Sequence, residues 1–420
     1  MKKFYISLAA LFSIVASLIF SCCGNSVALE GIVTAVDNRD FRAAMDEILK
    51  YKDKKILDND SLLQLLSASY YGLAMKEKRQ VASDCKDMVV LPDGKSFLIN
   101  DGLDSVIKVF ALPSMDSVRV IRTGTRVNNM SLSPDGSTLA VSRINGSIAL
   151  YDVASGKEKK ALRGSSRDGE VKMVGYKEVL KNTHAVSPQN NNNKNKENSG
   201  SSTPQSSSSI MKVNQVLYIN DATVFTLSGN SKGELWNVKT GNATQIEGAD
   251  FSNINRVSFS KDGNLMATAS KNGAATIYNI KAGKATETAQ IMPGDNFVSF
   301  AMISPDNKYL VTLTGDEIAR IWDISSKKML HEVPMRTQLN SFDFSADGKY
   351  FMVGAVENAY IVETATGKVI TRIVTEGRPV VSVQMVGNEI AYADNRSFDF
   401  GTFLQGEKLI EAARKYTQQN

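Results

Sequence analysis

Histidine is nearly absent from this chain: His184 and His331 are the only two in 420 residues. Zinc sites draw mainly on histidine and cysteine, so a zinc centre has too few ligands here. The three cysteines are Cys22, Cys23 and Cys85, too few for a disulfide framework. A phosphate-binding loop, a Cys-x-x-Cys pair and a dinucleotide fingerprint are also lacking. We therefore expect no cofactor and no bound metal.

An excess of charge of one sign is lacking as well. The chain has 49 Lys and Arg residues against 44 Asp and Glu residues, for a net charge of +5. A nucleic-acid-binding protein gathers basic residues on one face. This even balance predicts no nucleic-acid partner, and the hydrophobic content of 42% is enough for a sizeable core.

A four-residue turn motif recurs along the chain. Its clear copies are Ser133-Pro134-Asp135-Gly136, Ser260-Lys261-Asp262-Gly263, Ser304-Pro305-Asp306-Asn307 and Ser345-Ala346-Asp347-Gly348. Weaker copies occur at Asp93, Asp221 and, without the aspartate, at Gly387. Aspartate bonds its own backbone in such turns, and glycine accepts a positive φ. Seven copies predict seven structural units.

Each unit carries the pattern of four short strands. Apolar residues stand eight, five and three positions before the aspartate, as in Ile254, Val257 and Phe259. The aspartate is followed by an apolar pair, a second polar turn, and then an aromatic residue beside an acid or an amide, as in Tyr278-Asn279. Self-similarity near 40 residues with four strands per unit is typical of a propeller blade. We predict an all-β fold, a seven-bladed β-propeller of four-stranded antiparallel blades over residues 81 to 403.

The repeat resembles the WD-repeat β-propeller family. The resemblance rests on Trp322-Asp323, its relaxed copies such as Trp236-Asn237, and the Ser-Pro-Asp-Gly turn. The Gly-His pair that usually opens such a repeat is missing. The buried hydrogen-bond network that this histidine joins in the family therefore cannot form, and blade stability must rest on apolar packing between neighbours.

The N-terminus is typical of a bacterial export signal. Lys2-Lys3 precede an apolar run from Phe4 to Phe20, and Ile19-Phe20-Ser21-Cys22 resembles a lipobox, which implies a lipoprotein signal over residues 1 to 22 and lipidation of Cys22. Cleavage after Ala28 and an uncleaved anchor remain alternatives. The expected location is the cell envelope, anchored in the membrane and facing the periplasm; cleavage after Ala28 would make the protein soluble in the periplasm or secreted.

Three segments depart from the repeat. Residues 29 to 80 show helical periodicity around Phe41 and Leu65, which predicts a helical hairpin with Asp60-Ser61 as a cap. The hairpin is expected to pack on the propeller, with a partner protein as the alternative. Residues 165 to 210 are rich in Asn and Ser and predict a disordered insert that serves as a tether, a regulatory segment or an inert loop. Residues 404 to 420 predict a short amphipathic helix that caps the last blade.

Two features are candidates for catalysis, but their positions favour structural roles. Gly229-Asn230-Ser231-Lys232-Gly233 fits the pattern of a hydrolase nucleophile elbow, but its place between two strands predicts a turn. Cys85 stands at an apolar strand position and predicts a buried hydrophobic residue. A channel-centred enzyme, or a calcium- or small-ligand-binding propeller of lactonase type, remains the alternative function.

One polar feature repeats seven positions before the marker aspartate, at the start of the predicted innermost strand of each blade. Its members are Lys86, Asn128, Asn214, Asn255, Ser299 and Asn340, with Arg378 near the last copy. As a ring at one mouth of the channel they would bind a peptide or an acidic partner, because amides both donate and accept hydrogen bonds. Alternatively, each amide satisfies its own loop. The preferred function is a non-catalytic scaffold for one or more envelope proteins.

Overall fold

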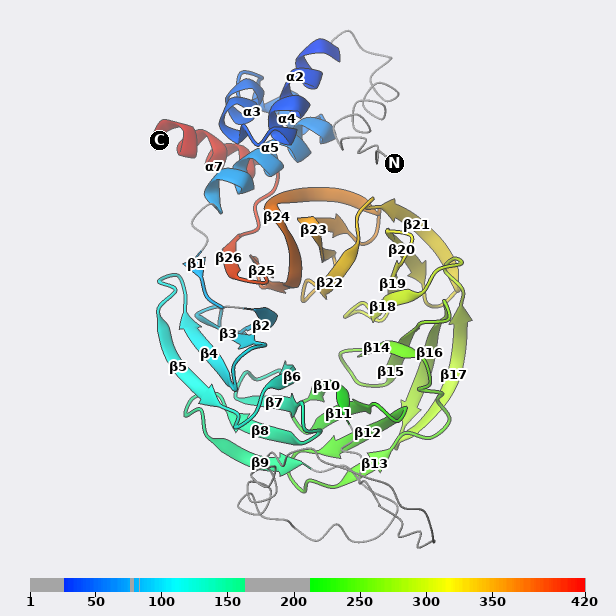
Figure 1. Ribbon diagram of the computed structural model, residues 1–420. Coiled ribbons are helices and arrows are strands. Elements are labelled where there is room, and N and C mark those ends of the chain that lie inside the picture. The colour runs from blue at the N-terminus through cyan, green and yellow to red at the C-terminus, as the bar shows by residue number, and fades with distance from the viewer. Residues whose placement is uncertain (1–25, 76–78, 83, 163–211, 420) are drawn as a thin grey trace, which may run out of the picture.

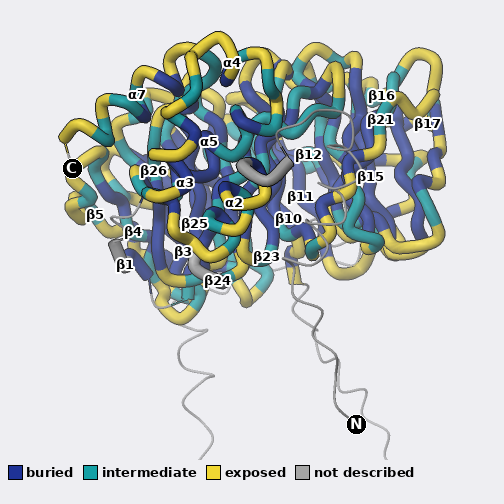
Figure 2. The backbone as a smooth tube through the Cα atoms, turned by 90° about the horizontal axis from the view of Figure 1, so that it is seen from above, coloured by how far each residue is buried: buried dark blue, intermediate teal, exposed yellow. Residues whose placement is uncertain are grey.

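The computed structural model describes residues 26–75, 79–82, 84–162 and 212–419, and it is a ring of antiparallel sheets with helices at one outer edge (Figure 1). Buried residues are concentrated in the strands, and exposed ones lie along the rims of the ring (Figure 2). The predicted lipidation site Cys22 and the predicted insert at 165–210 lie outside the described residues.

Five sheets contain four strands each, which pair in chain order. Sheet one comprises β2 (Cys85–Val90), β3 (Ser96–Asp101), β4 (Val106–Ala111) and β5 (Ser117–Arg122), and sheet two comprises β6 (Val127–Leu132), β7 (Thr138–Arg143), β8 (Ile148–Asp152) and β9 (Glu158–Leu162). Sheet three comprises β10 (Val213–Asn220), β11 (Thr223–Ser228), β12 (Lys232–Asn237) and β13 (Ala243–Gln245). Sheet four comprises β14 (Ile254–Phe259), β15 (Leu265–Ser270), β16 (Ala275–Lys281) and β17 (Lys284–Ile291), and sheet five comprises β18 (Val298–Ile303), β19 (Tyr309–Thr314), β20 (Ile318–Asp323) and β21 (Lys328–Pro334).

The sixth sheet overturns the prediction of seven blades. It joins six strands in the order β1-β26-β25-β24-β23-β22. They are β1 (Arg79–Gln80), β22 (Leu339–Phe344), β23 (Tyr350–Glu363), β24 (Lys368–Val386), β25 (Glu389–Asp394) and β26 (Ser397–Thr402). The described propeller therefore has six blades, and the repeats marked by Asp347 and Gly387 share one sheet.

A continuous strand produces this fusion. Sheets one to five are separate because a loop divides the last strand of each from the first strand of the next, as between β13 and β14. In sheet six, β24 runs without a break from Lys368 to Val386: its first part pairs with β23, and its second part, from Val380 to Val386, pairs with β25. Gly387 still forms the turn between β24 and β25, with φ 61°. The repeat motif thus marks a hairpin correctly, but it does not count separate sheets.

The recurring tetrapeptide is held by local hydrogen bonds. In the first clear copy, the Ser133 hydroxyl donates to Asp135 Oδ1 (2.6 Å), and the same Asp135 oxygen accepts the Ser137 N–H (2.9 Å). The Ser133 oxygen in turn accepts the Thr138 N–H (2.9 Å), and Gly136 takes φ 74°. The serine hydroxyl is the main reason that the pKa of the Asp135 carboxyl is lowered. The Ser260, Ser304 and Ser345 turns repeat these bonds.

Apolar clusters hold neighbouring sheets together. Leu98 and Val109 of sheet one pack with Met130 and Val141 of sheet two, and none of the four is more than 4% exposed. Within sheets, the indole N–H of Trp236 donates to Thr226 Oγ1 (2.9 Å), a bond that Trp322 and Thr312 repeat at 3.0 Å. The tryptophan of the repeat thus keeps a hydrogen bond to a threonine hydroxyl, although the histidine usual in the family is lacking.

The described N-terminal residues, from Ser26 on, form four helices where a hairpin was expected. They are α2 (Ser26–Asp37), α3 (Phe41–Ile48), α4 (Asp53–Leu57) and α5 (Asp60–Ala74). Asn59 caps α5 by accepting the Leu62 N–H (3.1 Å), one residue before the predicted cap. The C-terminal helix α7 (Gly406–Gln419) is confirmed, but its Leu409, Ile410 and Ala413 are buried in the apolar cluster of α2, α3 and α5 rather than on the face of a blade.

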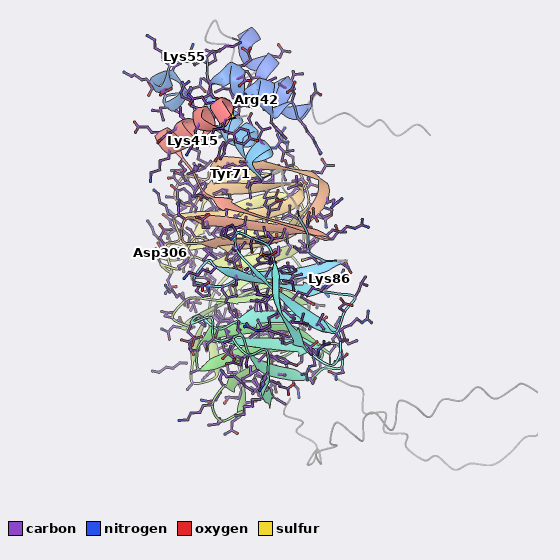
Figure 3. The ribbon with its side chains drawn as sticks, turned by 90° about the vertical axis from the view of Figure 1, so that its left-hand side faces the viewer. Arg42, Lys55, Tyr71, Lys86, Asp306 and Lys415 are labelled. Atoms are coloured by element: carbon purple, nitrogen blue, oxygen red, sulfur yellow. The ribbon has the colours of Figure 1, made fainter. Side chains whose placement is uncertain are left out.

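Helix α5 docks this helical unit on sheet six, as was predicted. Gln64 Nε2 donates to the Val369 carbonyl (2.7 Å), and the hydroxyls of Ser67 and Thr371 lie 3.1 Å apart. The Tyr71 hydroxyl, at the junction in Figure 3, donates to the Thr402 carbonyl (3.0 Å) and accepts the Leu404 N–H (2.8 Å). Strand β1 pairs with β26 through two residues only. The clamp at Tyr71 therefore reinforces the short strand pairing that joins the N-terminal region to the last strand.

None of the helices within the described residues combines the length and the apolar character that crossing a bilayer requires.

Candidate functional site: the central channel

Every innermost strand of the ring begins with a β-bulge. In β6, Val127 pairs with Arg143 and Asn129 with Ser142, which leaves Asn128 as the extra residue between them. The same register shift occurs at the start of β2, β10, β14, β18 and β22 and within β24. A bulge re-aims its side chain and bends the strand. The extra residues in chain order are Lys86, Asn128, Asn214, Asn255, Ser299, Asn340 and Val381.

The predicted polar ring is therefore a ring of bulges, with one correction. Val381, not Arg378, is the equivalent residue of the last repeat, and Arg378 instead lies 3.8 Å from the buried carboxylate of Asp394. Lys86, Asn128, Asn214 and Asn340 line one cavity of about 670 Å³ at the channel mouth. Asn255, Ser299 and Arg378 do not line it. A partner-binding role for this set remains a prediction.

Two of the amides bond the next sheet, not their own loops. Asn128 Nδ2 donates to the Val213 carbonyl (2.7 Å), and Asn255 Nδ2 donates to the Val298 carbonyl (2.8 Å). The Ser299 hydroxyl bonds Leu313 within its own sheet (3.0 Å). For Asn128 and Asn255, the amide thus fastens one innermost strand to its neighbour.

At two of the bulges, the residue that follows also bonds the next sheet. Asn129 Oδ1 accepts the Val216 N–H of the next sheet (2.8 Å), and Gln215 bonds both the N–H and the carbonyl of Val257 (2.8 Å each). At the closing seam, Gln384 Oε1 accepts the N–H of Val90 (2.5 Å). Because an innermost strand has no further strand beside it, these side chains satisfy edge groups that would otherwise lack partners.

A second cavity, of about 680 Å³, opens toward the marker turns and is lined by apolar residues such as Leu217 and Met302. The two cavities share lining residues that form the waist of the channel, among them Asp87, Arg256, Phe300 and Phe342. The sequence reasoning missed all four. Asp87 and Arg256 directly follow bulge residues. The other repeats have an amide, serine or aromatic residue at this position, so the charge was the available signal of a channel site.

The electrostatics of this waist are unusual. Arg256 Cζ lies 4.3 Å from the centroid of the Phe300 ring. Burial lowers the pKa of Arg256, and Asp87 opposes that shift through its charge. Burial raises the pKa of Asp87 to about 6 and that of Asp343, which accepts the Met385 N–H (2.8 Å), to about 7. Both carboxyls are therefore partly protonated near neutral pH.

The two faces of the ring differ in character. Lys86 marks the face with the bulges, called here the bulge face, and Asp306 marks the face with the marker turns, called the turn face; Figure 3 shows them on opposite sides. Four exposed apolar side chains lie in loops of the bulge face: Leu103 (60% exposed), Ile144 (45%), Met292 (60%) and Phe297 (50%). Ile144 itself lines the first cavity. Exposed apolar groups and a polar opening therefore share this face.

The features weighed for catalysis have structural places. Gly229 to Gly233 spans the turn between β11 and β12, as predicted, with Ser231 at φ 62°. Cys85 is 1% exposed, and burial raises the pKa of its thiol. His331 lies in β21, with Nε2 3.0 Å from the Ala365 carbonyl, and His184 lies outside the described residues. Within the described part of the chain, no three His, Cys, Asp or Glu residues are grouped as metal ligands.

This geometry defines a class: a β-propeller with an open, polar central channel. Two family models match the chain, the WD40 domain of anaphase-promoting complex subunit 4 over residues 106–179 and the WD domain, G-beta repeat, over residues 243–279. The chain is thus similar to WD-repeat β-propellers in two stretches of its sequence and in its fold.

Relatives carry the same repeat. WD repeat-containing protein 1 of Mus musculus is 24% identical over 258 residues, covering 58% of this chain and 41% of the relative. Protein tipD of Dictyostelium discoideum is 22% identical over 313 residues (72% and 51%), and the small ribosomal subunit protein RACK1 of Caenorhabditis elegans is 28% identical over 116 residues (25% and 34%). The chain spans about half the length of these relatives or less. WD-repeat propellers generally bind other proteins.

We expect the seam residue Gln215 to contribute strongly to stability. Gln215→Leu leaves the N–H and carbonyl of Val257 without their partner, so the free energy of unfolding should fall by about 1–3 kcal/mol. Asn214→Ala, at the adjacent exposed bulge, should change it by less than about 0.5 kcal/mol. Denaturant unfolding of both variants checks this. Equal losses would contradict the structural role of the seam.

The raised pKa of Asp343 predicts a pH-dependent stability. The folded state holds the proton to a higher pH than the unfolded chain, so this group's stabilising contribution is full at low pH and is lost as pH rises through about 7. Asp343→Asn keeps an acceptor for the Met385 N–H but does not titrate. Its stability relative to wild type should rise from pH 4 to pH 7 and then level off, as measured by denaturant unfolding across that range. A constant difference would refute the assignment.

Proposed function

We propose that this chain is a non-catalytic scaffold that binds partner proteins through its bulge face and is held at the bacterial cell envelope by a lipid on Cys22. The observation that carries the binding role is the presence of exposed apolar side chains on the same face as a polar cavity, which Ile144 lines. Leu103, Ile144 and Phe297 are each 45% exposed or more and come from different loops of one face.

Such a surface has the composition of a protein interface. Rigid sheets hold the loops in place, so the loops lose little conformational entropy when a partner binds. The apolar groups supply contact area, and the cavity between them admits a side chain from a partner. The exposed apolar residues of the outer strands line neither channel cavity; they are Val118 and Val120 of β5 and Met329 and Leu330 of β21.

The anchoring part of the proposal is supported by sequence alone. Cys22 follows Ile19-Phe20-Ser21, and a thiol at a cleavage junction is the group that accepts a diacylglyceryl chain. Three acyl chains would give stable membrane attachment. The expected partners are envelope proteins on the periplasmic side.

Site-specific photo-crosslinking in intact cells tests the binding face. A photoreactive residue is placed in the full chain at Leu103 or Ile144, and at Val118 or Met329 as controls of similar exposure. Crosslinked products that are specific to Leu103 and Ile144 are expected. Equal capture at the control positions, or capture at none of the four, would refute the bulge face as the binding face.

The anchor is tested separately by labelling cells with a radioactive fatty acid. Wild type should incorporate the label and fractionate with membranes, and Cys22→Ser should do neither. Cys23→Ser is the matched control and should behave as wild type. An unlabelled wild-type protein would rule out lipidation and leave the binding role untouched.

A further inference from the structure

Arg256 is a cation without a close counter-ion at the waist of the channel. Its guanidinium stacks on the Phe300 ring at 4.3 Å and lines both channel cavities. Among the described residues it forms no ion pair, and Asp87 acts on it only through longer-range charge. A stacked guanidinium keeps its in-plane N–H fork available. Such a fork matches the two oxygens of a carboxylate.

The approach to Arg256 from the bulge face is basic. Lys86, Arg126 and Lys212 line the same cavity. Lys86 is paired with Asp84 (2.7 Å), but Arg126 and Lys212 are exposed and form no ion pair with any described residue. A cavity with walls of one charge sign concentrates ligands of the opposite sign.

The carboxyls of this cavity weaken that field only in part. Asp87 and Asp343 are the acidic residues among its lining residues. The Met385 N–H already binds Asp343, and the Met88 N–H binds Asp87 (2.9 Å). Burial raises the pKa of both, which reduces their negative charge near neutral pH. The cavity therefore favours an anion over a cation.

A buried donor supports the same conclusion. Ser341 lines the cavity, and its hydroxyl is buried without a hydrogen-bond partner among the described residues. A buried polar group of this kind usually has a partner, and its absence points to one supplied from outside. The exposed amide of Asn214 offers a further donor at the mouth.

We propose that Arg256 is the receptor for a side-chain carboxylate on an acidic segment of the partner protein, which enters the channel from the bulge face. The proposal rests on the proposed scaffold function and adds the chemistry of the partner. Arg126 and Lys212 would steer the segment to the mouth, and Arg256 would pair with the carboxylate that reaches the waist.

The test measures binding of a terminally blocked hexaglutamate peptide to the purified chain by calorimetry. Arg256→Met should weaken binding about tenfold or more, and Arg256→Lys should weaken it less, because lysine keeps the charge but loses the fork. Lys261→Met, which removes a cation from the turn-face cavity, is the matched control and should leave affinity within about twofold. Thermal unfolding shows whether each variant is folded. If Arg256→Met does not fold, the affinity of Arg256→Lys decides the test.

Three outcomes would overturn the proposal: no hexaglutamate binding, unchanged affinity in Arg256→Met and Arg256→Lys, or equal binding of a blocked hexalysine peptide. The last would mean that the carboxyls, not Arg256, select the ligand. If the peptide fails while crosslinking at Leu103 and Ile144 still captures a partner, the scaffold function stands and only the acidic segment is refuted.

Discussion

The unpaired edge of the innermost strands is the constraint on which the rest of this structure depends. Each first strand of a sheet has a hydrogen-bonded neighbour on one side only, and the part of β24 from Val380 to Val386 pairs only with β25. The outer N–H and C=O groups of these strands face the next sheet, where leaving them without partners is costly. Polar side chains near the bulges solve this problem: Asn128, Asn129 and Gln215 reach across to the following strand, and Gln384 does the same at the closing seam. The ring is thus fastened by side chains around its axis as well as by apolar packing farther out.

This constraint limits which channel residues are free to bind something else. An amide that bonds the next strand stabilises the fold. Substituting it lowers stability, so the effect on ligand binding is not measured separately. Residues at equivalent positions without a seam bond stand out for that reason. Arg256 stacks on Phe300 rather than bonding the next backbone, and Ser341 has no partner among the described residues. The channel chemistry is concentrated at these exceptions.

Sequence reasoning worked where the interaction is local. The Ser133 turn closes through bonds within five residues, so its motif is legible and recurs with each hairpin. Helices α3, α5 and α7 follow from periodicity and caps. The reasoning failed at β24, which carries the outer strand of one repeat and the innermost strand of the next without a break, so that two repeats form one sheet. It also selected Arg378, because the bulge register that identifies Val381 is a property of strand pairing.

By itself, then, the sequence determined the strand hairpins, their turns, the helices α3, α5 and α7 and the type of repeat, since each depends on residues close together in the chain. Only the tertiary structure decided how many sheets the hairpins make, which amides hold the seams, and that Arg256 meets Phe300 and Asp87 in one channel. Those outcomes depend on pairs such as Gln215 with Val257 and Asp343 with Met385, both 42 residues apart, and on Asn129 with Val216, 87 apart. The physical reason is that the N–H and C=O groups at a strand's edge bond the side chains that ring closure brings beside them. Ring closure depends on the whole chain.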